Sequence, residues 1–96
     1  MQNIKKRGLG GDVIISVAGM FGYTNIITSA CGLILDTVAY RDTLDGYFAE
    51  ATILATSENL TIFAPEGYYS EYSVLADAVI SRYWNGTGFV GLPEIC

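Results

Sequence analysis

The acidic side chains come nearest to a catalytic pattern in this sequence. Asp42 and Asp45 form one close pair, and Glu66 and Glu71 form another. Catalysis by carboxylates needs two groups held rigidly in different environments, so that one is protonated while the other is ionised. Both pairs lie near glycine or proline, which indicates solvated loops rather than a rigid site. We therefore expect no catalytic residues among them.

Nucleophilic and metal chemistry lack the residue types that they need. The chain of 96 residues contains no histidine, so a serine or cysteine nucleophile has no imidazole base and a zinc site has few ligands. Asp36 with Asp42 and Asp45 offers oxygen ligands for calcium, but the spacing of a calcium-binding loop is missing. We expect a protein that is not an enzyme and that binds no metal or cofactor.

The two cysteines, Cys31 and Cys96, leave two interpretations open. They can pair in an oxidising compartment, but the sequence does not show that they meet in space. Two free thiols in a reducing cytoplasm are the simpler interpretation, and we take them as the expectation.

The composition favours a small domain that associates with other chains. Hydrophobic residues make up 51% of the sequence and charged residues 16%, whereas the usual charged share is about 25%. A domain of this length buries roughly two-thirds of its unfolded surface, so its stability margin is small. Part of its apolar surface is expected to face another chain, which predicts a homo-oligomer.

The charge is unevenly distributed along the chain. Lys5, Lys6 and Arg7 lie close together near the start, and only two basic residues follow, against ten acidic ones. An acidic body repels phosphate groups, so we expect no nucleic-acid partner. The basic, glycine-rich segment 1–11 is expected to be a flexible arm, either merely solvated or docked on an acidic partner. Residues 12–96 are expected to form a single β-rich domain.

The uncharged stretch 13–35 admits two kinds of secondary structure. It is long enough for a membrane-spanning helix, and basic residues precede it. Asn25 at its centre is costly in lipid, however, and the many β-branched residues favour strands. We expect strands at 12–19 and 24–40 with a turn at 19–25, and a small membrane protein remains the alternative.

The second half of the chain predicts short strands joined by turns. A loop is expected at 40–48. In 47–56 every second residue is apolar, which indicates a strand with its alanine-rich side turned inward. Asn85 followed by Gly86 is a strong hairpin signal. The remaining expectations are a turn at 57–59, strands at 60–64, 79–84 and 87–91, and any helical turn within 71–78. The sequence thus predicts a mostly β, single-domain antiparallel sheet or sandwich, completed by oligomerisation.

Large aromatic residues gather near the C-terminal end of the sequence. Aromatic rings stack on sugar rings, which makes a carbohydrate-binding module one alternative. They also supply cores and contacts between subunits, and this is the interpretation that we favour. The expected contact surface consists of Tyr68, Tyr69, Tyr83, Trp84 and Phe89.

The segment 65–96 resembles a known module. "PEGYYS" at 65–70, "SRYWNGTGFVG" at 81–91 and Cys96 are similar to a module at the ends of surface and fibre proteins of Bacteroidetes bacteria and their phages. The resemblance implies a non-enzymatic structural protein of a phage virion, such as a head fibre, capsid decoration or fibre-base subunit. It further implies β-rich homotrimers that dock on capsid or tail proteins through the basic N-terminal arm.

Overall fold

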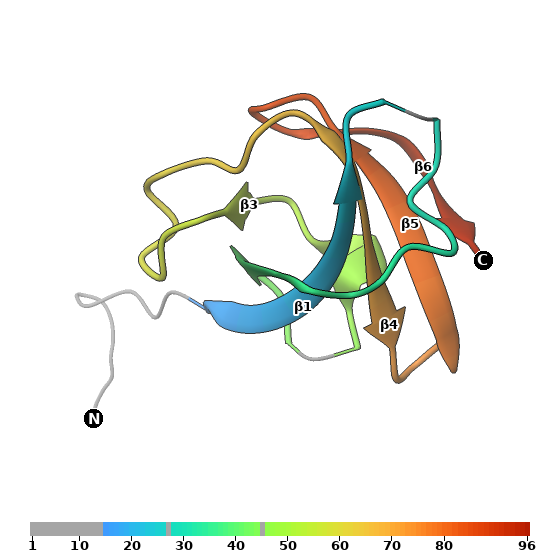
Figure 1. Ribbon diagram of the computed structural model, residues 1–96. Coiled ribbons are helices and arrows are strands. Elements are labelled where there is room, and N and C mark those ends of the chain that lie inside the picture. Colours follow the sequence, from blue (N-terminus) through green and yellow to red (C-terminus); the bar gives the residue numbers. More distant parts are fainter. Residues whose placement is uncertain (1–14, 27, 45) are drawn as a thin grey trace.

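The computed structural model describes residues 15–26, 28–44 and 46–96, which form one curled antiparallel sheet (Figure 1). The expectation of a mostly β, antiparallel single domain is confirmed. The arm at 1–11, with its cations Lys5, Lys6 and Arg7, lies outside the described residues. The elements are β1 (Val17–Thr24), β2 (Thr37–Arg41), the 3-10 helix η1 (Phe48–Glu50), β3 (Leu54–Ala55), β4 (Gly67–Ser73), β5 (Ala78–Trp84) and β6 (Phe89–Ile95).

Strand β1 joins the two halves of the sheet. The strand order is β3-β2-β1-β4-β5-β6, and every neighbouring pair is antiparallel. Residues 17–21 of β1 pair with β2, whereas residues 22–24 pair with β4. The strand therefore bends as it passes from one partner to the other, which gives the sheet its curl (Figure 1).

The prediction of a turn at 19–25 is wrong, because most of that segment lies within β1. Its glycines serve close packing instead of chain reversal. A Cβ on Gly19 would lie 2.0 Å from the Glu71 carboxylate, and one on Gly22 would lie 2.6 Å from the Ser70 hydroxyl oxygen. Neighbouring side chains thus occupy the space above both glycines, and the strand continues straight through them.

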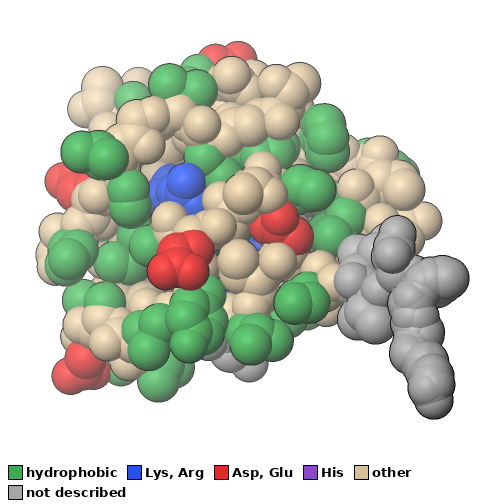
Figure 2. All heavy atoms as spheres, turned by 180° about the vertical axis from the view of Figure 1, so that it is seen from behind, with side chains coloured by type: hydrophobic (Ala, Val, Ile, Leu, Met, Phe, Trp, Pro, Cys, Tyr) green, Lys and Arg blue, Asp and Glu red, His purple; other side chains and the backbone are tan. Residues whose placement is uncertain are grey.

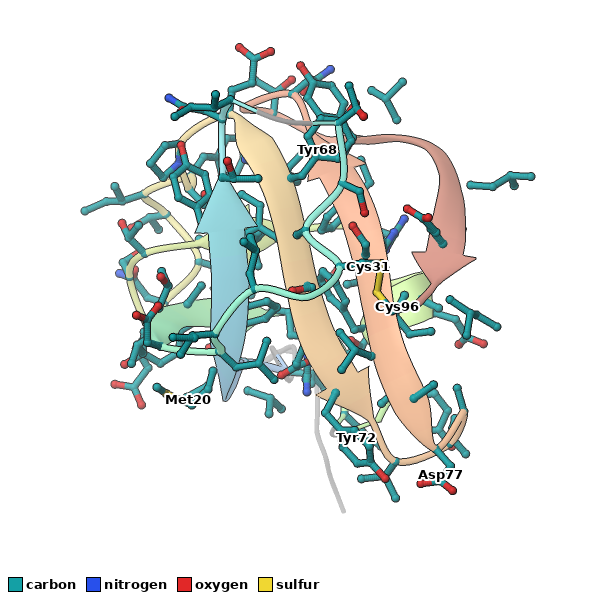
Figure 3. All side chains as sticks on the ribbon, turned by 45° about the vertical axis from the view of Figure 1, so that its right-hand side comes forward. Met20, Cys31, Tyr68, Tyr72, Asp77 and Cys96 are labelled. Atoms are coloured by element: carbon teal, nitrogen blue, oxygen red, sulfur yellow. A yellow bond between two sulfur atoms is a disulfide. The ribbon has the colours of Figure 1, made fainter. Side chains whose placement is uncertain are left out.

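Of the strand predicted at 24–40, only the last part forms a separate strand, β2 (Thr37–Arg41), and a long loop precedes it. The described part of 25–36 crosses the outer face of the sheet, which is the face opposite the core (Figures 1 and 3). The Ala30 backbone N–H donates to the Ser81 hydroxyl oxygen at 3.0 Å, and Ala30 is fully buried there. These contacts hold the loop against the sheet.

Cys31 in this loop forms a disulfide with Cys96, just beyond β6 (Figure 3). The expectation of two free thiols is therefore wrong. The two cysteines meet because the loop crosses the sheet from β1 toward β6, a route that no local sequence signal encodes.

The helical alternative for 13–35 is wrong for the residues described there, which are strand and loop. Within 15–26, 28–44 and 46–96, the structure has no helix with the length and apolar character needed to cross a membrane.

The predicted strand at 47–56 is reduced to η1 and the two-residue β3. One reason is that the Arg82 guanidinium donates from Nη1 to the carbonyl oxygens of Phe48 and Ala51, each at 2.8 Å. These carbonyls are bound by a side chain, so the segment does not need a strand ladder. Phe48 and Leu54 are both fully buried, so the buried side of the segment is not limited to its alanines.

The hairpin at Asn85–Gly86 is confirmed, since β5 and β6 pair across it. The Asn85 side-chain oxygen accepts from the backbone N–H groups of Thr87 and Gly88, each at 2.9 Å. Gly86 adopts a φ of 101°, which favours glycine. The strand predicted at 79–84 is confirmed as β5, and the segment 71–78 holds no helical turn, because β4 extends to Ser73 and a tight turn leads directly into β5.

The core lies on the inner side of the curl, against η1 and the segments around β3. Trp84 is fully buried, and its indole N–H donates to the Ala64 carbonyl oxygen at 2.8 Å. Around it the rings meet edge to face, with Phe21 and Phe48 5.1 Å apart. The buried cluster consists of Phe21, Ala39, Phe48, Ala51, Leu54, Ala64, Tyr69, Ile80 and Trp84.

Many apolar side chains nevertheless remain at the surface. Figure 2 shows them spread over the face turned away in Figure 1, among polar atoms and separate acidic groups. Ile34 and Leu92, on other parts of the described chain, are 81% and 93% exposed. The small core leaves apolar surface uncovered, as the composition indicates.

Candidate functional site

The carboxylates at 66 and 71 do not meet. Glu71 is buried and forms a bidentate ion pair with Arg41, with Nε to Oε1 at 2.7 Å and Nη2 to Oε2 at 3.0 Å. Glu66 is exposed just before β4. Five residues along an extended chain span roughly 16 Å. The buried glutamate holds β2 to β4, and losing one partner of such a pair is strongly destabilising.

Asp42 ties a loop together. Its carboxylate accepts hydrogen bonds from the backbone N–H groups of Thr52 and Ile53, at 2.8 and 3.0 Å, and from the Thr52 hydroxyl. Burial by itself would raise the pKa of Asp42, but these hydrogen bonds outweigh it and lower the pKa overall. Its expected neighbour Asp45 lies outside the described residues, and Asp36 accepts a hydrogen bond from the adjacent Thr37 hydroxyl. Among the residues described, no three potential metal ligands cluster.

The structure divides the five aromatic residues expected at a contact surface. Tyr69 and Trp84 are 2% and 0% exposed, so their assignment to a surface is wrong and they belong to the core. Burial raises the pKa of the Tyr69 phenol well above its usual value. Phe89 is partly buried, 4.9 Å from the Trp84 ring, and the Arg82 guanidinium stacks 3.8 Å from its centre. Tyr68 and Tyr83 are partly exposed on the outer face.

Tyr68 and Tyr83 border a hollow of the described surface with a volume of about 660 Å³. We call it the tyrosine hollow. Its other functional side chains are Tyr23, Asn25 and Glu66. Partly exposed aromatic rings beside a carboxylate and an amide are the groups that ligand pockets use for packing and for orientation.

The sheet register places the rings. Tyr68 of β4 is paired directly with Tyr83 of β5, and their ring centroids lie 4.9 Å apart. Tyr23 comes from the end of β1, next to β4. A Cβ on Gly67 would lie 2.6 Å from the Tyr23 ring, so glycine is needed for that ring to lie across the start of β4.

Glu66 holds two of the three tyrosine hydroxyls. The Tyr23 hydroxyl donates to the Glu66 backbone carbonyl at 2.9 Å, and the Tyr83 hydroxyl donates to the Glu66 carboxylate. That hydrogen bond, together with partial burial and the negative charge of Glu66, raises the pKa of Tyr83. The Tyr83 phenol therefore remains a neutral donor at physiological pH, and Glu66 fixes the orientation of both rings.

A second hollow of about 360 Å³ also borders Tyr68 and Tyr83. Thr28 and Glu94 contribute to it, along with residues of β5 and β6. Because both hollows share the same two rings, the tyrosine pair lies between them. The two hollows adjoin at these rings, at the start of β4 and the end of β5, and Figure 3 shows Tyr68 at this end of the sheet.

The loop that crosses the outer face frames the site on one side. It carries Asn25 and Thr28, and the disulfide Cys31–Cys96 fixes it to the end of β6. The Ser29 hydroxyl also donates to the Glu94 carboxylate at 3.0 Å. The disulfide therefore orders both the loop and the rim of the second hollow.

Three residues of the tyrosine hollow were missed by the sequence analysis. Tyr23 and Asn25 were assigned to a turn, and Glu66 was assigned to a loop as a candidate acid. A possible signal was the pattern of Gly67 followed by Tyr68, since a glycine between bulky residues can mark close approach of another side chain. Their meeting depends on the pairing of β1 with β4, which no local pattern specifies.

In comparisons with known proteins, no family model, no curated protein and no solved structure matches this chain.

Proposed function

We propose that this protein is a non-enzymatic structural subunit of a phage virion that acts by assembling with copies of itself. A head fibre, capsid decoration or fibre-base subunit has this role, and the resemblance of the segment 65–96 supports it. The homotrimer and the docking on capsid or tail proteins through Lys5, Lys6 and Arg7 belong to the same proposal. The observation that carries self-assembly is an apolar row on the outer face of the sheet.

This outer-face row runs across four strands. Met20 of β1 is paired with Val38 of β2, and Tyr72 of β4 is paired with Val79 of β5. Met20 and Tyr72 lie on the same face because each is two residues from the pair Gly22 and Ser70, which face each other. Met20, Val38 and Tyr72 are 48%, 55% and 46% exposed. Figure 3 shows Met20 and Tyr72 at the end of the sheet opposite to Tyr68.

A second copy of the chain suits this row. No side chain of the row is charged, whereas the whole chain has a net charge of -5. Like copies therefore meet through the row with their acidic groups kept at the margin, where Asp77 accepts a hydrogen bond from the Tyr72 hydroxyl at 2.6 Å. Apolar contact between copies also covers surface that the small core leaves in water.

The disulfide supports a place outside a reducing cytoplasm. Disulfides persist in secreted proteins and at virion and cell surfaces, and they are rare in cytosolic proteins. Cys31 and Cys96 are linked in this structure, which agrees with a virion component that is exposed to an oxidising medium.

Light scattering after size exclusion tests the assembly. The chain mass is 10.4 kDa, and we expect the purified protein to elute with three times this mass. Val38→Lys places a cation in the centre of the row and is expected to shift the protein to the mass of one chain. Ile62→Lys is the matched control, since Ile62 is 62% exposed in the loop between β3 and β4.

A monomeric wild-type protein, or equal effects of the two lysine variants, would contradict assembly through this row. Circular dichroism of each variant verifies that the strands are retained. The virion assignment is tested separately, by mass spectrometry of purified phage particles from the source culture, which should contain the chain in many copies.

A further inference from the structure

We propose that the tyrosine hollow and the second hollow together bind a neutral oligosaccharide. This inference does not depend on the assembly proposed above, because the site lies at the opposite end of the outer face from the row of Met20 and Tyr72 (Figure 3).

The tyrosine pair provides the apolar platform. Tyr68 and Tyr83 are partly exposed, and their rings are tilted by 47° with centroids 4.9 Å apart. One face of a pyranose ring presents only C–H groups, and such a face packs against an aromatic ring while the hydroxyls stay at the edges. Rings that are this rigid lose little entropy on binding, since the register of β4 and β5 already holds them.

The polar groups suit hydroxyls. The Glu66 carboxylate accepts one hydrogen bond, from the Tyr83 hydroxyl, and an ionised carboxylate has about four lone-pair positions. The remaining ones can accept from sugar hydroxyls. The exposed Asn25 amide, at the same hollow, both donates and accepts. A hydroxyl is also both donor and acceptor, so a sugar can satisfy these groups together.

The charge of the site excludes anions. Glu66 lies in the tyrosine hollow and Glu94 in the second hollow. Arg82 also lines the second hollow, but its guanidinium is engaged inward, donating to two backbone carbonyls and stacking on Phe89. Phosphates and acidic sugars therefore meet like charge, which leaves a neutral sugar.

The dimensions favour a chain of sugars over a small cation. Aromatic rings beside a carboxylate also bind quaternary ammonium groups, but such a group needs rings close around it. The tyrosine hollow alone has about 660 Å³, and the second hollow of about 360 Å³ continues past the same rings. Two hollows on either side of one aromatic pair match consecutive units of an oligosaccharide.

The experiment is titration of the ¹⁵N-labelled protein, followed by amide chemical shifts. The neutral probes are maltohexaose, mannohexaose and chitohexaose, and the others are hexagalacturonic acid and tetramethylammonium. We expect at least one neutral hexasaccharide to shift amides at 23–25, 66–68 and 81–83, and hexagalacturonic acid to leave them unchanged. The corresponding disaccharide should bind more weakly, because it reaches only one hollow.

Variants assign the binding to the rings. Tyr68→Ala is expected to weaken binding by about tenfold or more, because a stacking partner is lost. Tyr72→Ala is the matched control, because it removes an exposed tyrosine from the same strand and face at the other end. It should leave sugar affinity unchanged while altering the mass in light scattering. Tyr83→Phe keeps the ring and removes the hydroxyl, so it tests the link to Glu66 without disturbing packing.

Several results would overturn the proposal. One is that none of the neutral hexasaccharides shifts the amides of the hollow. Another is that tetramethylammonium shifts them and the sugars do not, which would assign an aromatic cation site instead. Equal affinity for the disaccharide and the hexasaccharide would show that the second hollow does not contribute to binding. Loss of binding in Tyr72→Ala but not in Tyr68→Ala would place the sugar on the outer-face row.

Discussion

Removal of the disulfide is expected to cost this domain much of its stability. Cys31 and Cys96 are separated by 65 residues. Cross-linking a loop of this length lowers the entropy of the unfolded chain and stabilises the folded state by roughly 4 kcal/mol at 25 °C. Small domains have a total free energy of unfolding of about 5 to 15 kcal/mol. The double variant Cys31→Ser with Cys96→Ser is therefore expected to lie close to the unfolding threshold.

Urea unfolding of the oxidised protein and of the double variant measures this cost. Trp84 is the only tryptophan and is fully buried, so its fluorescence reports the core directly. With an m-value of about 1 to 2 kcal/mol/M for a domain of this size, the midpoint should fall by roughly 2 to 4 M. Thiol titration of the denatured wild-type chain should find no free thiol.

The control is Ser29→Ala, which leaves the disulfide intact but removes two hydrogen bonds beside it, from the Ser29 hydroxyl to Glu94 and from the Cys31 backbone N–H to the Ser29 hydroxyl oxygen. We expect it to lower stability by about 1 kcal/mol, far less than the double variant. A loss below about 1 kcal/mol in the double variant would refute the reasoning. It would mean that the loop and the end of β6 are held in place without the covalent link.

Three further predictions concern the core and one loop. Gly19→Ala places a Cβ 2.0 Å from the Glu71 carboxylate and should cost about 3 kcal/mol in urea unfolding by displacing the buried ion pair; an unchanged midpoint would contradict that packing. Trp84→Phe removes a buried N–H donor and ring volume, so thermal unfolding should show that the free energy of unfolding falls by about 2 kcal/mol. An unchanged free energy of unfolding would contradict the central place of Trp84 in the core. The hydrogen bonds from Thr52 lower the pKa of Asp42 in the folded state, so its contribution is present above about pH 4 and is lost as the pH falls through the folded value. Stability of the wild type relative to Asp42→Asn, measured against pH, should accordingly shrink in acid, and a pH-independent difference would contradict it.

Local chemistry was enough to predict part of the fold. The Asn85–Gly86 turn closes through hydrogen bonds within four residues, so its signal is complete in the sequence. The β-branched composition favoured strands over a helix in 13–35, and β1 agrees with it.

The candidate site was predicted only in part. Alternation along β4 and β5 implies that Tyr68 and Tyr69 face opposite sides, as do Tyr83 and Trp84. It does not tell which side is covered by η1 and becomes the core, so all four were expected at a surface. The structure buries Tyr69 and Trp84 and leaves Tyr68 and Tyr83 partly exposed.

By itself the sequence determined the strand content, the tight hairpin and the shortage of charge that leaves apolar surface exposed. These features depend on residue types and on neighbours a few positions away. Tertiary structure alone decided that Gly19 and Gly22 lie within a strand, that Glu71 pairs with Arg41, and that Cys31 reaches Cys96. Each of these contacts joins residues far apart in the chain, and its free energy exists only once β1 has paired with both β2 and β4.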